Sequence, residues 1–304
     1  MHVFYCDHFE VVLPDRHPFP MQKYRELRLA LLREGVLGPD ELVPAERAPL
    51  EAIRAVHAPD YVDAFLAGRL EPAVQKRIGF PWSTSHVERT LASVGGTLAA
   101  SRAALREGLA GNLAGGTHHA YRAFGSGYCV FNDIAVAAAA LLSEGLVERV
   151  LVFDVDVHQG DGTAALFADE PRVFTTSLHG ARNFPLRKQQ SDLDVELADG
   201  TADEAYLQAV HEALETSLER ARPDVVFVQA GVDPLDADHL GRLSVTREGL
   251  YRRDELVLRR LRSVDLPAVL TLGGGYSRPI DATLQAHVGT YRAAKAVLGE
   301  AALR

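Results

Sequence analysis

Residues 150–163 read VLVFDVDVHQGDGT, an apolar run followed at once by acids, a histidine and glycines. The apolar run, residues 149–153, is rich in β-branched side chains, which is typical of a strand buried in a parallel sheet. Asp154, Asp156 and His158 follow at a spacing of two, so in an extended chain their side chains lie on one side. The stretch therefore predicts a strand whose carboxyl end carries a polar site.

Three interpretations of this polar site are open. It could be an ordinary strand end with solvated acids. It could be a phosphotransferase loop, because Asp-x-Asp after an apolar strand suits an aspartate nucleophile and Mg²⁺. It could be a metal hydrolase. His158 argues against the phosphotransferase, because Mg²⁺ prefers oxygen ligands, whereas Asp156 together with His158 suits Zn²⁺ or Fe²⁺.

The composition is that of an ordinary globular protein, with 304 residues of which 47% are hydrophobic and 24% charged. A net charge of -9 without a basic patch argues against nucleic acid as a partner. The longest apolar run, residues 134–142, is too short to span a bilayer, and residues 1–8 do not have the pattern of a signal peptide. Two cysteines are too few for a disulfide framework, so the sequence predicts a protein of the cytoplasm. We expect a single catalytic domain over residues 1–304, without a membrane partner.

Predicted strands and helices alternate along the chain. We expect strands at 3–6, 111–116, 149–153, 173–178, 224–230 and 267–272, and helices at 21–33, 49–57, 60–66, 86–109, 134–145, 162–167, 204–222, 246–262 and 280–298. Residues 179–194 are expected to be irregular. This alternation predicts an α/β fold with a mostly parallel sheet and helices on both faces. Gly95 and Gly96, inside one predicted helix, indicate close packing of a neighbour.

The unusual polar residues all follow predicted strands, and in parallel sheets ligands bind at that edge. Asp156, His158 and Asp233 would give one metal ion three ligands and leave a position for water or substrate. A second metal is not expected, because the next acid after Asp233 is Asp236, three residues further on. This coincidence favours an active site with one metal ion over loose acids.

The remaining polar residues suit proton transfer. His118 or His119 would act as the base for a water molecule, and Asp154 and Asp161 are available to orient the two imidazoles. Tyr276, after a glycine turn, can donate its hydroxyl to a developing oxyanion. Together these residues predict hydrolysis of an amide or an ester.

These motifs resemble the zinc-dependent histone deacetylase family, which has the three-layer arginase/deacetylase fold. The matching motifs, in order along the chain, are HPFP at 17–20, GGTHHA at 115–120, GSGYCVFND at 125–133, DVDVHQGDG at 154–162, QAGVDPLDADHLG at 229–241 and GGGY at 273–276. Within the family the chain is most similar to class IV, through HPF, GRLSVT at 241–246 and the short glycine run. The chain has 28 arginines and 4 lysines, and this excess of arginine indicates a bacterial source.

The resemblance implies a role for each of these residues. Zinc would bind Asp156, His158 and Asp233, while Asp154 would face His118 and Asp161 would face His119. His119 would be the principal base and His118 mainly electrostatic, and Tyr276 would polarise the scissile carbonyl. The resemblance also implies a monovalent cation such as K⁺, bound near Asp154, Ser177 and Leu178. It implies a tunnel that accepts the acyl-lysine stem, with walls formed by Gly127, Tyr128 and Phe184.

Two departures from the family pattern lie close to the site. Gln159 stands where many members have a second histidine. Residues 185–192 lack a glycine-rich turn common elsewhere, so the rim of the tunnel, which bears on substrate preference, departs from the family pattern. We therefore expect a zinc-dependent amidohydrolase that removes acetyl or longer acyl groups from lysine side chains of proteins. The alternatives are a deacetylase of polyamines or related small acylated amines and a non-catalytic module that binds acyl-lysine. Tyr276 together with the histidine pair argues against a pure binding module.

Overall fold

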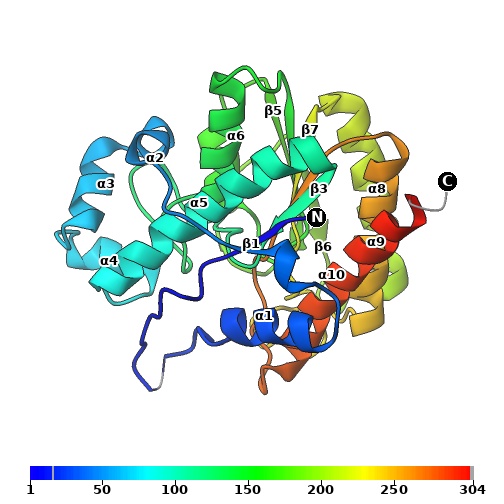
Figure 1. The fold of residues 1–304 in the computed structure, drawn as a ribbon, viewed down its shortest axis with the longest axis horizontal. Coiled ribbons are helices and arrows are strands. Elements are labelled where there is room, and N and C mark those ends of the chain that lie inside the picture. The colour runs from blue at the N-terminus through cyan, green and yellow to red at the C-terminus, as the bar shows by residue number, and fades with distance from the viewer. Residues whose placement is uncertain (16, 302–304) are drawn as a thin grey trace.

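The computed structural model describes residues 1–15 and 17–301, and these residues form one central sheet flanked by helices (Figure 1). The sheet has eight strands in the order β2-β1-β3-β8-β7-β4-β5-β6. All of its described pairings are parallel. The strands are β1 (Val3–Tyr5), β2 (Leu42–Pro44), β3 (Leu109–Asn112), β4 (Val150–Asp154), β5 (Val173–Gly180), β6 (Leu193–Leu197), β7 (Val225–Gln229) and β8 (Ala268–Thr271).

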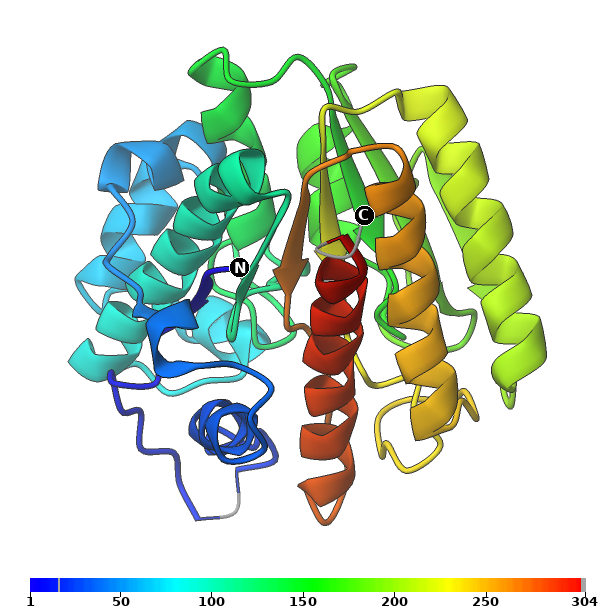
Figure 2. The same cartoon turned by 45° about the vertical axis from the view of Figure 1, so that its right-hand side comes forward.

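Helices cover both faces of this sheet (Figure 2). Along β4, Val150 and Val152 join the core on one face, while Leu151 and Phe153 join the core on the other. This alternation is the period-two geometry of a strand buried on both sides. The helices are α1 (Lys23–Arg33), α2 (Leu50–Val56), α3 (Pro59–Leu66), α4 (Pro72–Ile78), α5 (Thr84–Glu107), α6 (Asp133–Ser143), α7 (Asp161–Phe167), α8 (Asp203–Ala221), α9 (Arg247–Ser263) and α10 (Asp281–Ala301).

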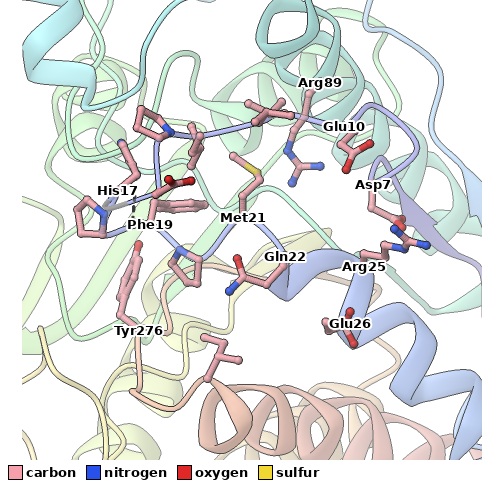
Figure 3. A pocket seen from close by; sticks show the side chains of 18 of the residues that line it. Asp7, Glu10, His17, Phe19, Met21, Gln22, Arg25, Glu26, Arg89 and Tyr276 are labelled. Atoms are coloured by element: carbon pink, nitrogen blue, oxygen red, sulfur yellow. Dashed lines mark hydrogen bonds between the residues drawn. The ribbon is translucent and has the colours of Figure 1, made fainter.

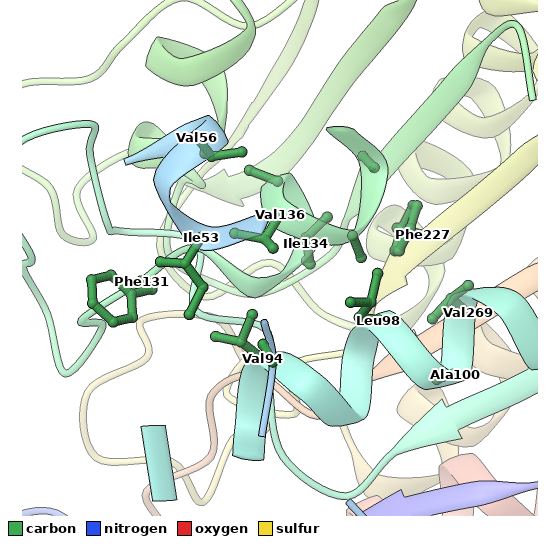
Figure 4. Packing of buried hydrophobic residues seen from close by; sticks show 14 of the residues in the cluster. Ile53, Val56, Val94, Leu98, Ala100, Phe131, Ile134, Val136, Phe227 and Val269 are labelled. Atoms are coloured by element: carbon green, nitrogen blue, oxygen red, sulfur yellow. The ribbon is translucent and has the colours of Figure 1, made fainter. Parts of the chain in front are cut away.

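The first face packs against α5 and α6. Figure 4 shows Leu98 of α5 and Ile134 of α6 lying against Phe227 and Val269 of neighbouring strands. The second face packs against α8, α9 and α10 through buried apolar side chains such as Leu214. The sheet is therefore the middle of three layers, which confirms the predicted α/β architecture.

The sequence-based expectations miss some short elements. Residues 179–194 were expected to be irregular, but β5 extends to Gly180 and β6 begins at Leu193. Of the residues of β6, only Leu197 is buried, so this edge strand lacks the apolar run by which a central strand is recognised. For α4, only Ile78 is buried, so no apolar stripe marks this helix. Across residues 1–15 and 17–301, the structure contains no helix with the length and apolarity needed to cross a bilayer.

Candidate active site

Four neighbouring strands carry the polar residues of the site. In the sheet β3, β8, β7 and β4 lie side by side, in that order. The loops that follow them carry, in the same order, the two adjacent histidines, the glycine turn with Tyr276, the acid Asp233 and the DVDVH motif. Because all four strands run in the same direction, their carboxyl ends meet at one edge. The fold thus brings together residues that are far apart in the sequence.

Asp156, His158 and Asp233 form what we call the three-donor cluster. The Nδ1 atom of His158 lies 3.0 Å from Oδ1 of Asp156 and 3.0 Å from Oδ2 of Asp233. One ligand atom from each residue lies within 4.8 Å of the other two, and all three side chains are buried. Two carboxylates and one imidazole that converge in this way are a donor set that Zn²⁺ accepts.

Backbone groups hold the carboxylates of the three-donor cluster. The amide of Gly274, in the turn after β8, donates to Oδ2 of Asp156 at 2.7 Å. The amide of Val157 donates to Oδ1 of Asp233 at 2.8 Å. Each acid is thus bound by an amide from a different strand end, which fixes the direction in which its remaining lone pairs point.

Each of the two adjacent histidines pairs with its own carboxylate. Nδ1 of His118 lies 2.6 Å from Oδ2 of Asp154, and Nδ1 of His119 lies 2.6 Å from Oδ1 of Asp161. These are the pairs that the family resemblance implies. Asp161 also accepts a hydrogen bond of 2.9 Å from the hydroxyl of Tyr121. Nε2 of His118 lies 4.0 Å from Oδ1 of Asp156, and the ring of His119 lies 6.0 Å from that of His158, so both imidazoles lie beside the three-donor cluster.

The two histidines differ in their protonation. Burial lowers the pKa of His118, but the carboxylates of Asp154 and Asp156 outweigh burial and raise it to about 9. Burial lowers the pKa of His119 to about 4, and the adjacent His118 adds to this decrease against the opposing effect of Asp161. Near neutral pH, His118 is therefore charged and His119 is neutral. A neutral imidazole can accept a proton, whereas a charged one supplies positive potential.

Tyr276 lies at the end of the glycine turn, with its ring 6.0 Å from that of Phe19. Its backbone amide donates to Oδ2 of Asp238 at 2.6 Å, which ties the turn to the loop after β7. Burial raises the pKa of Tyr276 well above its ordinary value, and Asp233 and Asp156 add to this increase. The hydroxyl thus keeps its proton and can donate a hydrogen bond. The ring extends toward Phe19 (Figure 3). It lies beside a cavity of about 1130 Å³ that residues 7–15 and 17–22 line in part.

The residues expected to form the tunnel lie next to the catalytic candidates. The ring of Phe184 meets the ring of His119 edge to face, with centroids 4.9 Å apart. A side chain at Gly127 would place its Cβ 2.7 Å from Cδ2 of His119, so only glycine fits there. The ring of Tyr128 lies 6.2 Å from that of Tyr276. Gly127 and Phe184 therefore lie against His119, and Tyr128 lies near Tyr276.

The residues expected for a monovalent cation also lie together. Asp154 at the end of β4 pairs directly with Ser177 of β5, and Leu178 is the next residue of that strand. All three residues are buried. The hydroxyl of Ser177 lies 3.0 Å from Nδ1 of His179.

The structure adds residues that the sequence analysis did not identify as part of the site. Lys23 at the start of α1 is buried, and its Nζ lies 3.2 Å from the carbonyl oxygen of Gly273 and 3.4 Å from that of Gly275. The side-chain amide of Gln229 donates from Nε2 to the carbonyl oxygen of Gly116 at 3.1 Å. Lys23 follows the HPFP motif by three residues, and this position was the only signal in the sequence that Lys23 could belong to the site.

Comparison with known proteins identifies the family. The model of the histone deacetylase domain matches residues 17–291, which is most of the chain. The protein belongs to the histone deacetylase family. Every motif of the site described above lies within the matched residues.

Relatives of this histone deacetylase family member agree with the assignment. An uncharacterized protein of Picosynechococcus sp. (strain ATCC 27264 / PCC 7002 / PR-6) is 45% identical over 97% of this chain and 98% of its own. Histone deacetylase 2 of Arabidopsis thaliana is 30% identical over 86% of this chain and 70% of its own. The crystal structure of a histone deacetylase homologue from Aquifex aeolicus superposes with a TM-score of 0.81 at 22% identity, covering 96% of this chain and 84% of that one. The fold is therefore of the arginase/deacetylase type, as the family resemblance implied.

Proposed function

We propose that the protein is a zinc-dependent amidohydrolase that removes acetyl or longer acyl groups from N-acyl-lysine side chains of proteins. Membership of the histone deacetylase family supports a hydrolase of this class. The observation that carries the proposal is the arrangement of the three-donor cluster. It is buried, Nε2 of His118 lies 4.0 Å from Oδ1 of Asp156, and the ring of His119 lies 6.0 Å from that of His158. The glycine turn that ends in Tyr276 donates from the amide of Gly274 to Asp156, so a scissile amide would meet a metal ion, a base and a hydrogen-bond donor together.

The donor set fits one zinc ion per chain. Asp156 and Asp233 would offer carboxylate oxygens and His158 its Nδ1 atom, and Fe²⁺ accepts the same ligands. When bound, the ion supplies Lewis-acid polarisation of water and of the substrate carbonyl. A monovalent cation such as K⁺ would bind near Asp154, Ser177 and Leu178, as the family resemblance implies.

The side chains around the cluster would divide the proton transfers. His119, neutral and held through Nδ1 by Asp161, would take a proton from the attacking water at Nε2 and later give it to the leaving lysine amine. His118, charged beside Asp154, would supply positive potential. Tyr276 would donate its hydroxyl to the carbonyl oxygen as negative charge develops there.

The substrate would enter between the tunnel residues. Gly127, Tyr128 and Phe184, which lie beside His119 and Tyr276, would form a narrow approach with aromatic walls that suits the four-carbon stem of lysine. The net charge of -9 is compatible with basic peptides around the acylated lysine.

The test is deacylation of fluorogenic peptides that carry acetyl-lysine or longer acyl-lysines, with acetylpolyamines assayed in parallel. For Tyr276→Phe we expect kcat to fall roughly hundredfold or more, because a donor to the developing oxyanion is lost. Tyr251→Phe, a change on α9 outside the site, is the matched control and keeps wild-type turnover. Turnover of acetylpolyamines alone would replace the protein substrate by a small molecule. Absence of any turnover with one zinc ion bound would overturn the proposal and favour a binding module.

A further inference from the structure

A fully buried arginine contacts the backbone of the loops that carry the three-donor cluster. Arg253, in the middle of α9, has an exposed fraction of 0%. Its Nη1 atom donates to the carbonyl oxygen of Gly231 at 2.6 Å, and its Nη2 atom lies 3.4 Å from the carbonyl oxygen of Ala230. Both carbonyls belong to the loop that follows β7 and leads to Asp233.

The same guanidinium reaches the loop that follows β4. Nη1 of Arg253 lies 3.5 Å from the carbonyl oxygen of Val155 and 3.4 Å from the hydroxyl of Tyr206. That hydroxyl itself donates to the carbonyl of Val155 at 3.3 Å. Val155 directly precedes Asp156 in the chain. One side chain thus contacts the backbone on both strand ends that carry members of the three-donor cluster.

Apolar packing alone would not need a charge at this position. A buried ion pair costs desolvation free energy, and an apolar residue of similar size would fill the same space. Arg253 is held in turn by Asp254, at 2.8 Å, and Asp254 accepts a hydrogen bond of 2.6 Å from Thr290 of α10. The planar guanidinium offers several donors in fixed directions, which suits carbonyls that belong to two different loops.

We infer that Arg253 is a positioning residue that sets the distance between the loops after β4 and β7, and thereby the separation of Asp156, His158 and Asp233. Asp254 and Thr290 fix its guanidinium from the helix layer. The inference rests on the proposed function, because it assigns the three-donor cluster to a metal ion. It extends the site from the strand ends into the helices behind the sheet.

The test compares Arg253→Met and Arg253→Lys with Arg252→Met, an exposed arginine on the same helix. Three quantities are measured on the full chain, with folding checked by circular dichroism. They are zinc affinity by competition with a chelator, the visible absorption spectrum of the Co²⁺-loaded protein, and hydrogen exchange over residues 155–158 and 230–233 without metal.

For Arg253→Met we expect zinc affinity to fall roughly 10- to 100-fold, as for other side chains that orient metal ligands, with a changed cobalt spectrum and faster exchange in both loops. Arg253→Lys keeps the charge but cannot reach both loops with one ammonium, so its effect is intermediate. Arg252→Met behaves as wild type.

Wild-type zinc affinity, cobalt spectrum and exchange in a folded Arg253 variant would overturn the inference. If Arg253→Met does not fold, Arg253→Lys decides the question by the same three measurements. Failure of the wild-type protein to bind zinc would instead contradict the proposed function. In that case the exchange of the metal-free protein still decides whether Arg253 holds the two loops together.

Discussion

His118 and His119 are adjacent in the chain, yet their surroundings give them different properties. His118 faces two carboxylates, those of Asp154 and Asp156, whereas His119 faces Asp161, which also accepts a hydrogen bond from Tyr121. The first environment favours a charged imidazole and the second a neutral one. The geometry thus supports the division of roles that the family resemblance implies, in which His119 is the principal base.

Replacing each histidine tests this division. His119→Ala should lower kcat roughly 100- to 10,000-fold, because a general base is lost. His118→Ala should lower it by a smaller factor, about 10- to 100-fold, because only an orienting and electrostatic contribution is lost. His211→Ala on the exposed face of α8 is the control in the same steady-state assay. A larger loss for His118→Ala than for His119→Ala would reverse the assignment.

Lys23 holds the glycine turn that presents Tyr276. Its Nζ lies within hydrogen-bond distance of two carbonyls of the glycine turn and 5.1 Å from the centre of the Tyr276 ring. Lys23→Met should therefore lower kcat roughly 10- to 100-fold with little change in KM, because the turn that presents Tyr276 loses charged hydrogen bonds. Lys76→Met on the exposed side of α4 is the matched control. An unchanged kcat for Lys23→Met would contradict this role.

Residues of the site differ in how far the sequence could predict them. Asp156, His158 and Asp233 follow apolar strands directly, so the pattern of the chain is enough to predict that they lie at one sheet edge. Lys23 and Arg253 lie on helices, and only the tertiary packing brings them to that edge. A lysine or an arginine on a helix is usually exposed, so the neighbouring sequence does not indicate that either residue is buried.

The helices and strands also differ in how far the sequence predicts them, and the packing of α5 was predicted from its glycine pair. A Cβ at Gly95 would overlap the carbonyl oxygen of Glu46 and lie 2.8 Å from the amide nitrogen of Ala48. This close approach of residues 46–48 confirms the packing that Gly95 and Gly96 predicted. By contrast, β6 and α4 have few buried residues, and the hydrophobic period of the chain does not reveal them.

Two glycine substitutions measure this effect. Gly95→Ala should destabilise the protein by about 1–3 kcal/mol, because the added methyl group has no space against the neighbouring backbone. Gly289→Ala, in α10, meets nothing within 4 Å and should stabilise the protein by about 0.5–1 kcal/mol, because alanine favours the helix. Free energies of unfolding from urea titration compare the two changes. Equal effects of the two substitutions would contradict the packing described for α5.

At the scale of the whole molecule, the order of the strands makes the site. In the sequence β3 and β4 come before β7 and β8, but in the sheet β8 and β7 lie between β3 and β4. The ends of four strands then form one continuous edge. The sequence predicted a parallel sheet and polar strand ends, but the strand order depends on contacts between distant segments. The single-domain organisation, the class IV subtype, the bacterial source and the cytoplasmic location stay predictions.

We propose that one zinc ion at the three-donor cluster makes the protein an acyl-lysine hydrolase. The most direct measurement is a titration of metal-free protein with Zn²⁺, in which bound zinc and the rate of deacetylation of an acetyl-lysine peptide are recorded together. We predict no deacetylation without metal and a linear rise that ends at one zinc ion per chain, with both binding and activity lost in Asp233→Asn. Full activity in the metal-free protein, or no activity with one zinc ion bound, would contradict a zinc-dependent hydrolase.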